Sequence, residues 1–242
     1  MTVPKYGTSI VRSQDPTLPR RSDVSYFRYM FGIAAGPVGG GGAFGPFLDG
    51  GAALSDTDIR AALAATGFAT FAGLDLVLEE VECWRGYVRA DYVCMNSNAL
   101  SVIEIKSDRD SLRRFDEQVR IYSAVADRVT LVVGWSLAAH ALRGAPSWWD
   151  VVLAEREPTF NIRFVPLRDG AQNPGVTADA LVAMLPIDDV RRLACAAGES
   201  LGRLRGHALR QAVANYVSPD ELRTAIREWL GRLSQRRSRI VS

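Results

Sequence analysis

The alternation of strand and helix patterns between residues 88 and 134 constrains the fold of this chain more than any other feature. Residues 88–95 and 100–105 are strand-like and flank a short polar turn. Residues 108–126 then carry apolar side chains at helical spacing. Residues 129–134 form a continuous apolar run, which is typical of a strand buried on both faces. This order predicts an α/β fold.

The flanking segments divide the 242 residues into three expected parts. Residues 1–54 contain prolines and a dense glycine run, and no Gly-Lys-Ser/Thr follows, so we expect a flexible leader and loop rather than a phosphate-binding loop. Ser55 can cap a helix that contains Ile59 and Leu63. Ser218 and Pro219 are typical of the start of a final helix. We expect a core at 55–170 and a helical C-terminal extension at 171–242, with strands at 149–154 and 160–165 and helices at 188–204, 208–216 and 219–233.

Composition excludes several classes of protein. The formal net charge of +2 neither requires nor excludes a nucleic-acid partner. The three cysteines are far apart in sequence, so neither a disulfide framework nor a zinc site is expected. No apolar run approaches the length of a membrane span, and the first residues lack the pattern of a signal peptide. We therefore expect a cytoplasmic protein that does not bind membranes.

Two acidic residues and a lysine on neighbouring predicted strands indicate chemistry. Asp91 lies on the first strand of the hairpin, and Glu104 and Lys106 lie on the second. Lys106 is one of two lysines among 29 basic residues. Lysine is a compact charge that can act beside a water molecule, whereas arginine is effectively always protonated.

The geometry of a hairpin would bring these three side chains together. Alternate residues share one face of a strand, so Glu104 and Lys106 project together, and pairing would place Asp91 near Glu104. Two such carboxylates repel each other unless a cation lies between them, and Mg²⁺ takes one or two carboxylates. Lys106 would orient a bound water. The alternative is a cross-strand salt bridge on a solvated face.

Two further features favour the metal site. Glu79, Glu80 and Glu82 lie one hairpin length before Asp91, and a carboxylate at the end of a helix there could supply a further ligand. Gln118 and Tyr122 are four residues apart on the next predicted helix and so share a face. They could hold a phosphate or the attacking water, although taken by themselves they favour a surface glutamine and a core tyrosine.

The ordered set Glu80, Asp91, Glu104-Ile105-Lys106 and Gln118-x-x-x-Tyr122 resembles the PD-(D/E)XK nuclease superfamily, with a Gln-x-x-x-Tyr element similar to that of RecB-type nuclease domains. The likeness is strongest over residues 55–140, to small standalone bacterial and phage proteins. Ala90 stands where the superfamily often has proline. The resemblance implies a restriction-endonuclease-like core with a central mixed sheet. It also implies the metal ligands, which are Asp91, Glu104, the carbonyl of Ile105 and Glu80, with Glu79 as the alternative to Glu80.

The expected function is Mg²⁺-dependent hydrolysis of phosphodiester bonds in DNA, with Mn²⁺ able to substitute for Mg²⁺, in DNA repair, recombination or phage-related processing. The expected catalytic residues are Glu80, Asp91, Glu104, Lys106, Gln118 and Tyr122. Arg113, Arg114 and Arg120 lie near the expected site and could contact phosphates, or could form a solvated helix face. The alternative function is a catalytically silent nucleic-acid-binding module on the same fold. RNA is a weaker alternative substrate, and a homodimer would suit cleavage of both strands.

Overall fold

The computed structural model describes residues 53–66, 74–96, 99–157, 159, 161–198 and 203–241. Residues Gly51–Ser242 form one compact unit, to which all of the described residues belong. The expected flexible segment at 1–54 lies almost entirely outside the described residues. The expected division at residue 170 stays a prediction.

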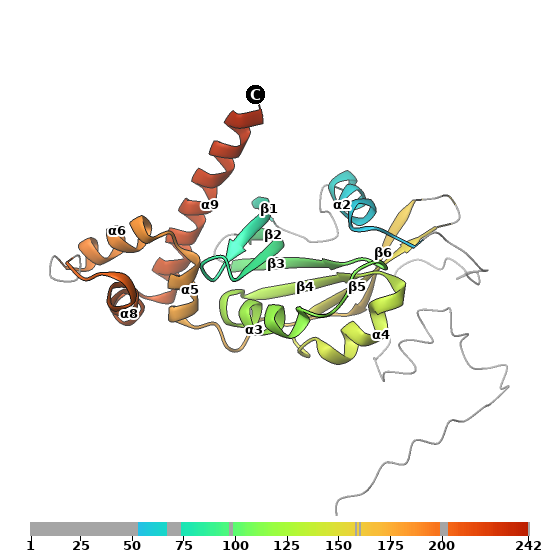
Figure 1. Cartoon of the computed structure of the whole chain (residues 1–242), viewed down its shortest axis with the longest axis horizontal. Helices are drawn as coiled ribbons and strands as arrows, with labels where there is room; N and C mark the ends of the chain where they lie inside the picture. The colour runs from blue at the N-terminus through green and yellow to red at the C-terminus, as the bar shows by residue number, and fades with distance from the viewer. Residues whose placement is uncertain are drawn as a thin grey trace, which may run out of the picture. The chain divides into compact units, whose positions relative to one another are not determined.

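A six-stranded mixed sheet forms the centre of this unit, in the order β1-β2-β3-β4-β5-β6 (Figure 1). Its strands are β1 (Leu76–Cys83), β2 (Val88–Asn96), β3 (Ala99–Lys106), β4 (Arg128–Val133), β5 (Asp150–Arg156) and β6 (Ile162–Arg168). Strands β3, β4 and β5 are parallel, and the remaining pairs are antiparallel. The α/β fold predicted from the alternating pattern is therefore confirmed, and the sheet is mixed, as the resemblance implied.

Helices cover both faces of the sheet (Figure 1). They are α2 (Asp56–Ala65), α3 (Phe115–Val125), α4 (Trp135–Gly144), α5 (Ala178–Met184), α6 (Ile187–Ala197), α8 (Gly206–Tyr216) and α9 (Pro219–Val241). Helix α2 packs on one face, where Ile59 and Leu63 join a cluster with Tyr92, Ile103 and Ile105. Helices α3 and α4 connect the parallel strands across the other face (Figure 1). Helices α5 and α9 contact the edge strand β1.

Several predicted elements are confirmed. The hairpin of β2 and β3, the buried strand β4 and the two later strands all form. Ser55 caps α2, and Ser218 and Glu221 form the reciprocal hydrogen bonds expected before α9. Leu222, Ile226 and Leu230 make the buried face of α9. Among the described residues, no helix combines the length and the apolar composition that a membrane crossing requires.

Other element boundaries were wrong. Helix α3 begins at Phe115 rather than 108, because the Asp110 carboxylate accepts 2.7 Å hydrogen bonds from the Ser107 backbone and hydroxyl and closes a local turn. Asp108 accepts hydrogen bonds from the amides of Leu54 and Ser136 instead of entering the helix. The helix expected at 188–204 ends at Ala197. Helices α4 and α5 and strand β1 were not predicted.

A buried ion pair joins α9 to the sheet. Asp127, between α3 and β4, is almost fully buried and accepts hydrogen bonds from the Leu100 amide at 2.9 Å and from Arg223 Nε at 3.0 Å. The Arg223 side chain is only 16% exposed. Removing the arginine would leave the carboxylate buried with only part of its compensation.

We therefore expect Arg223→Ala to lower the free energy of unfolding by about 3 kcal/mol, because breaking a buried pair leaves an uncompensated charge. Urea denaturation followed by circular dichroism measures this change. Arg191→Ala is the matched control, since Arg191 pairs with an 85% exposed Asp188 at 3.1 Å and should cost less than about 1 kcal/mol. If both substitutions lowered the free energy of unfolding equally, the Asp127–Arg223 pair would not stabilise the fold as a buried ion pair.

Candidate functional site

Strands β2 and β3 diverge at one end, and the predicted site lies where they separate. Their pairing runs from Asn96↔Ala99 only as far as Tyr92↔Ile103. Beyond that point β2 stays paired with β1 on its other side, and Glu104–Lys106 stay paired with β4. We call this opening the fork. Because β3 is unpaired with β2 there, its backbone groups can meet a side chain instead.

Asp91 fills the fork. Its Oδ2 accepts a 2.7 Å hydrogen bond from the Ile105 amide. In an extended strand the N–H and C=O of one residue point to the same side, so the carbonyl of Ile105 also faces the fork. A carboxylate and a backbone carbonyl are therefore presented together.

Glu104 is the most buried acid of the site, with 2% of its surface exposed. Its Oε1 accepts hydrogen bonds from Lys106 Nζ at 2.6 Å and from the Gln118 amide. Its Oε2 accepts one from the Tyr122 hydroxyl at 2.7 Å. The sequence pattern predicted that these four residues meet, and the structure brings them together. A carboxylate offers about four acceptor positions, so Oε2 retains capacity for one more partner.

The amide of Gln118 has an open acceptor. Its Oε1 is buried and finds no hydrogen-bond partner among the described residues. Buried polar atoms are usually paired, so an exception of this kind is informative. The Gln118 side chain donates to Glu104 through its Nε2, and its Oε1 could accept a hydrogen bond from a water or ligand at the site.

Arg60 was not among the predicted site residues, yet from helix α2 it binds two of the predicted acids, Glu80 and Asp91. From α2, its Nε donates to Asp56 at 2.7 Å, and its NH2 donates to Glu80 at 2.8 Å and also to Asp91 Oδ1. The guanidinium carbon lies 5.3 Å from the centre of the Tyr92 ring, within range of a cation–π contact. The sequence signal was only an Asp56–Arg60 pair at helical spacing, which is common on solvated helices.

The sequence predicted that Glu80 lies at the end of a helix. In the structure it lies on strand β1 instead. It stands between the pairs Glu79↔Tyr92 and Val81↔Ala90, and so opposite Asp91. Its φ of 51° is left-handed, which is uncommon for a residue other than glycine. Besides Arg60, its carboxylate contacts Arg89 Nε at 2.5 Å. The prediction of a helix was wrong because the alternating side chains of residues 76–83 suit an edge strand.

Burial controls the protonation of the site. It raises the pKa of Asp91 from 3.8 to about 7, and the negative charge of Glu104 adds to this effect. The Ile105 amide and Arg60 act in the opposite direction and do not cancel it. Burial and Glu104 also raise the pKa of the Tyr122 phenol, so it remains a hydrogen-bond donor.

Among the described residues, no three or more acidic, histidine or cysteine side chains are grouped so that they could hold a metal ion together. The donors at the fork are two carboxylates, of Asp91 and Glu104, and the carbonyl of Ile105. Such oxygen donors, few in number, suit Mg²⁺, which keeps waters and substrate oxygens in its shell. Glu80 is linked to Asp91 through Arg60.

The arginines expected to contact nucleic acid lie around α3. Arg113 and Arg114 are exposed in the segment before the helix. Arg120 is exposed on α3, with NH2 3.9 Å from Glu117. They present positive charge to solvent, and their role in binding stays a prediction.

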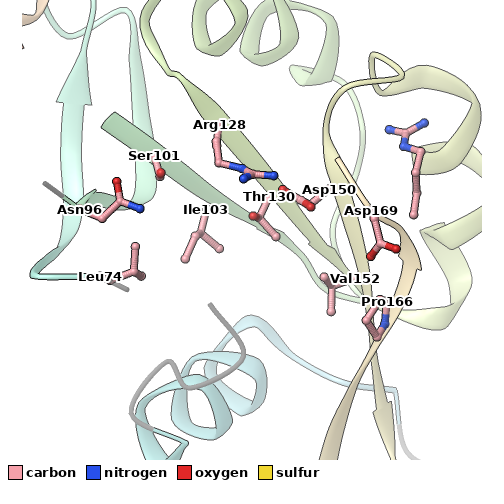
Figure 2. Close-up of a pocket in the computed structure, with 11 residues that line it drawn as sticks. Leu74, Asn96, Ser101, Ile103, Arg128, Thr130, Asp150, Val152, Pro166 and Asp169 are labelled. Atoms are coloured by element: carbon pink, nitrogen blue, oxygen red, sulfur yellow. The ribbon is translucent and has the colours of Figure 1, made fainter. Parts of the chain in front are cut away.

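A cavity of about 280 Å³ lies on the sheet face that α2 covers, opposite to the face of Glu104. Figure 2 shows Ser101, Ile103, Thr130 and Val152 projecting into it from the strands. Arg168, also in its wall, donates to the carbonyls of Trp149 and Pro146. None of the predicted site residues lines this cavity.

Comparison with known proteins gives a family for the chain. Residues 71–241 match the family model of bacteriophage P4 protein cII. Among solved structures, the chain is similar to the SPO1766 protein of unknown function from Silicibacter pomeroyi. The identity is 20%, the match covers 57% of this chain and 86% of that one, and the TM-score of 0.34 is too low to support an argument. No curated protein matches the chain.

The raised pKa of Asp91 predicts a dependence of stability on pH. The folded state binds this proton up to about pH 7, and the unfolded state only up to about pH 4. The stability that the proton provides is therefore present below pH 4 and is lost as the pH rises through 7. Asp91→Asn mimics the neutral acid, so we expect it to raise the free energy of unfolding at pH 8.5 by roughly 2–4 kcal/mol, at about 1.4 kcal/mol per pKa unit.

Urea denaturation at pH 4.5 and pH 8.5 tests this expectation, and the gain should shrink strongly at the lower pH. Asp188→Asn, at an 85% exposed position, is the control and should change little at either pH. A loss of stability in Asp91→Asn at pH 8.5 would show that the pair with Arg60 outweighs the burial of the charge.

Proposed function

The chain belongs to the family of bacteriophage P4 protein cII, and from the geometry of the fork we propose that it is a Mg²⁺-dependent nuclease. It would hydrolyse phosphodiester bonds in DNA on a core of the PD-(D/E)XK, restriction-endonuclease-like type. The observation that carries this proposal is the buried Glu104 carboxylate, which accepts hydrogen bonds from Lys106, Gln118 and Tyr122 and is close enough to Asp91 to raise its pKa.

A solvated salt bridge is a poor account of this arrangement. Glu104 and Lys106 are both buried. Burying an ion pair costs free energy even when it is well compensated, so such a pair is weak support for a purely structural role. Acids with strongly shifted pKa values in buried sites are more often functional, and Asp91 beside Glu104 has such a shift.

The chain's own donors fit a divalent cation. Asp91, Glu104 and the carbonyl of Ile105 would hold it, all through oxygen, which is the atom that Mg²⁺ prefers. Burial, together with the negative charge of Glu104, raises the pKa of Asp91, and a bound cation would favour the ionised carboxylate again. When bound, the cation would lower the pKa of a coordinated water and polarise the phosphoryl group.

The remaining side chains have separate roles in this proposal. Lys106 would orient the attacking water and offset the charge that develops on the phosphoryl oxygens. The open Oε1 of Gln118 would accept a hydrogen bond from that water. Tyr122 would keep Glu104 in place by donating to Oε2. Exposed Arg113, Arg114 and Arg120 would bind the backbone of the substrate.

We expect metal-dependent cleavage of single-stranded or plasmid DNA by the purified chain. Lys106→Ala and Asp91→Asn should each reduce the rate at least about 100-fold, because each removes a charge that acts on the transition state. A fluorescent oligonucleotide cleavage assay in Mg²⁺ and in Mn²⁺, with chelator as the blank, measures the rates. Parallel reactions on RNA identify the preferred nucleic acid.

Asp188→Asn is the matched control for loss of a carboxylate and should cleave at the native rate. Melting curves of all variants separate loss of chemistry from loss of fold. Tight DNA binding without cleavage in any divalent metal would favour the catalytically silent module instead. Cleavage that persists in both site variants would refute the proposed active site.

A further inference from the structure

Arg60 has contacts that a helix surface residue does not need. Its side chain is 19% exposed, and its guanidinium bonds to three carboxylates, of Asp56, Glu80 and Asp91. Only Asp56 belongs to its own helix. The guanidinium thus binds Oδ1 of Asp91, the acid that the proposed function assigns to a metal.

A metal and Arg60 would compete for Asp91. Oδ2 of Asp91 is engaged by the Ile105 amide, and Oδ1 by Arg60. A divalent cation at the fork needs carboxylate oxygen and repels a neighbouring guanidinium, so binding it would release Arg60 from Asp91. The positive charge of Arg60 therefore stands in for the cation in the metal-free chain.

After release from Asp91, the Arg60 side chain would remain at the site. Its Nε bond to Asp56 and its NH2 bond to Glu80 remain. The guanidinium would stay next to the cation, where substrate phosphate oxygens complete the metal shell. Arginine binds phosphate through two parallel hydrogen bonds and is well suited to this position.

We propose that Arg60 is a phosphate-binding residue of the site, which Asp91 holds until a divalent cation takes its place. This inference rests on the proposed function. The competing explanation is that Arg60 only ties α2 to the sheet. The two explanations predict different effects of removing Arg60. If its role is structural, affinity for the metal and affinity for the substrate should both fall. If it binds phosphate, affinity for the metal should rise and affinity for the substrate should fall.

The test uses the full chain and two binding measurements. Mn²⁺ affinity at pH 8.5 is measured by calorimetry without nucleic acid, for the native chain and for Arg60→Gln and Arg60→Lys. Affinity for a 5′-labelled DNA oligonucleotide is measured by anisotropy in saturating Mn²⁺, with every variant placed in the Lys106→Ala background so that the strand stays intact. Arg156→Gln is the matched control, since Arg156 also pairs with α2, through Asp58 at 3.6 Å.

We expect Arg60→Gln to bind Mn²⁺ about tenfold more tightly and the oligonucleotide about tenfold more weakly, a change of about 1.4 kcal/mol each way. Arg60→Lys should lie between it and the native chain, and Arg156→Gln should match the native chain in both assays. Unchanged or weaker Mn²⁺ binding by Arg60→Gln overturns the inference, as does unchanged oligonucleotide binding. If the native chain and all variants fold but bind no Mn²⁺, the proposed function itself fails.

Discussion

The burial of the Glu104 carboxylate is the constraint on which the rest of the site depends. Removing a charge from water costs several kcal/mol unless donors replace its hydration. Here a lysine on the same strand, and an amide and a phenol on α3, supply those donors. Because the donors come from two elements, the carboxylate fixes α3 against β3. The position of the helix and the chemistry of the site are therefore set by the same hydrogen bonds.

The sheet supplies the opening that this acid faces. Strand β3 has an antiparallel neighbour on one side and a parallel neighbour on the other, and its pairing with β2 stops before β3 ends. The fork is at the carboxyl end of the parallel strands, which is where α/β sheets usually bind ligands. Asp91 satisfies the Ile105 amide that the separation of the strands would otherwise leave without a partner.

The C-terminal helices contribute to the same region. Arg237 of α9 donates to the backbone carbonyls of Glu79 and Glu80 on the edge strand, and Arg227 pairs with Asp75 at 2.9 Å. These contacts cover an edge that could otherwise pair with another chain. They also hold the strand at the left-handed Glu80, whose carboxylate shares Arg60 with Asp91. The extension and the core thus meet beside the candidate site.

The sequence by itself determined the elements with strong local signals and the residues that alternate along them. The hairpin, the buried strand β4 and the capped helices α2 and α9 follow from periodicity and capping, and the Gln118–Tyr122 spacing placed both side chains on one helix face. Strand β1 was missed because its mixed apolar and acidic pattern also suits a helix end. Only the tertiary structure decided the partners of Asp91, since docking of α2 brings Arg60 to an acid 31 residues away. Local pattern cannot encode that contact, because it depends on how two elements pack rather than on how either one forms.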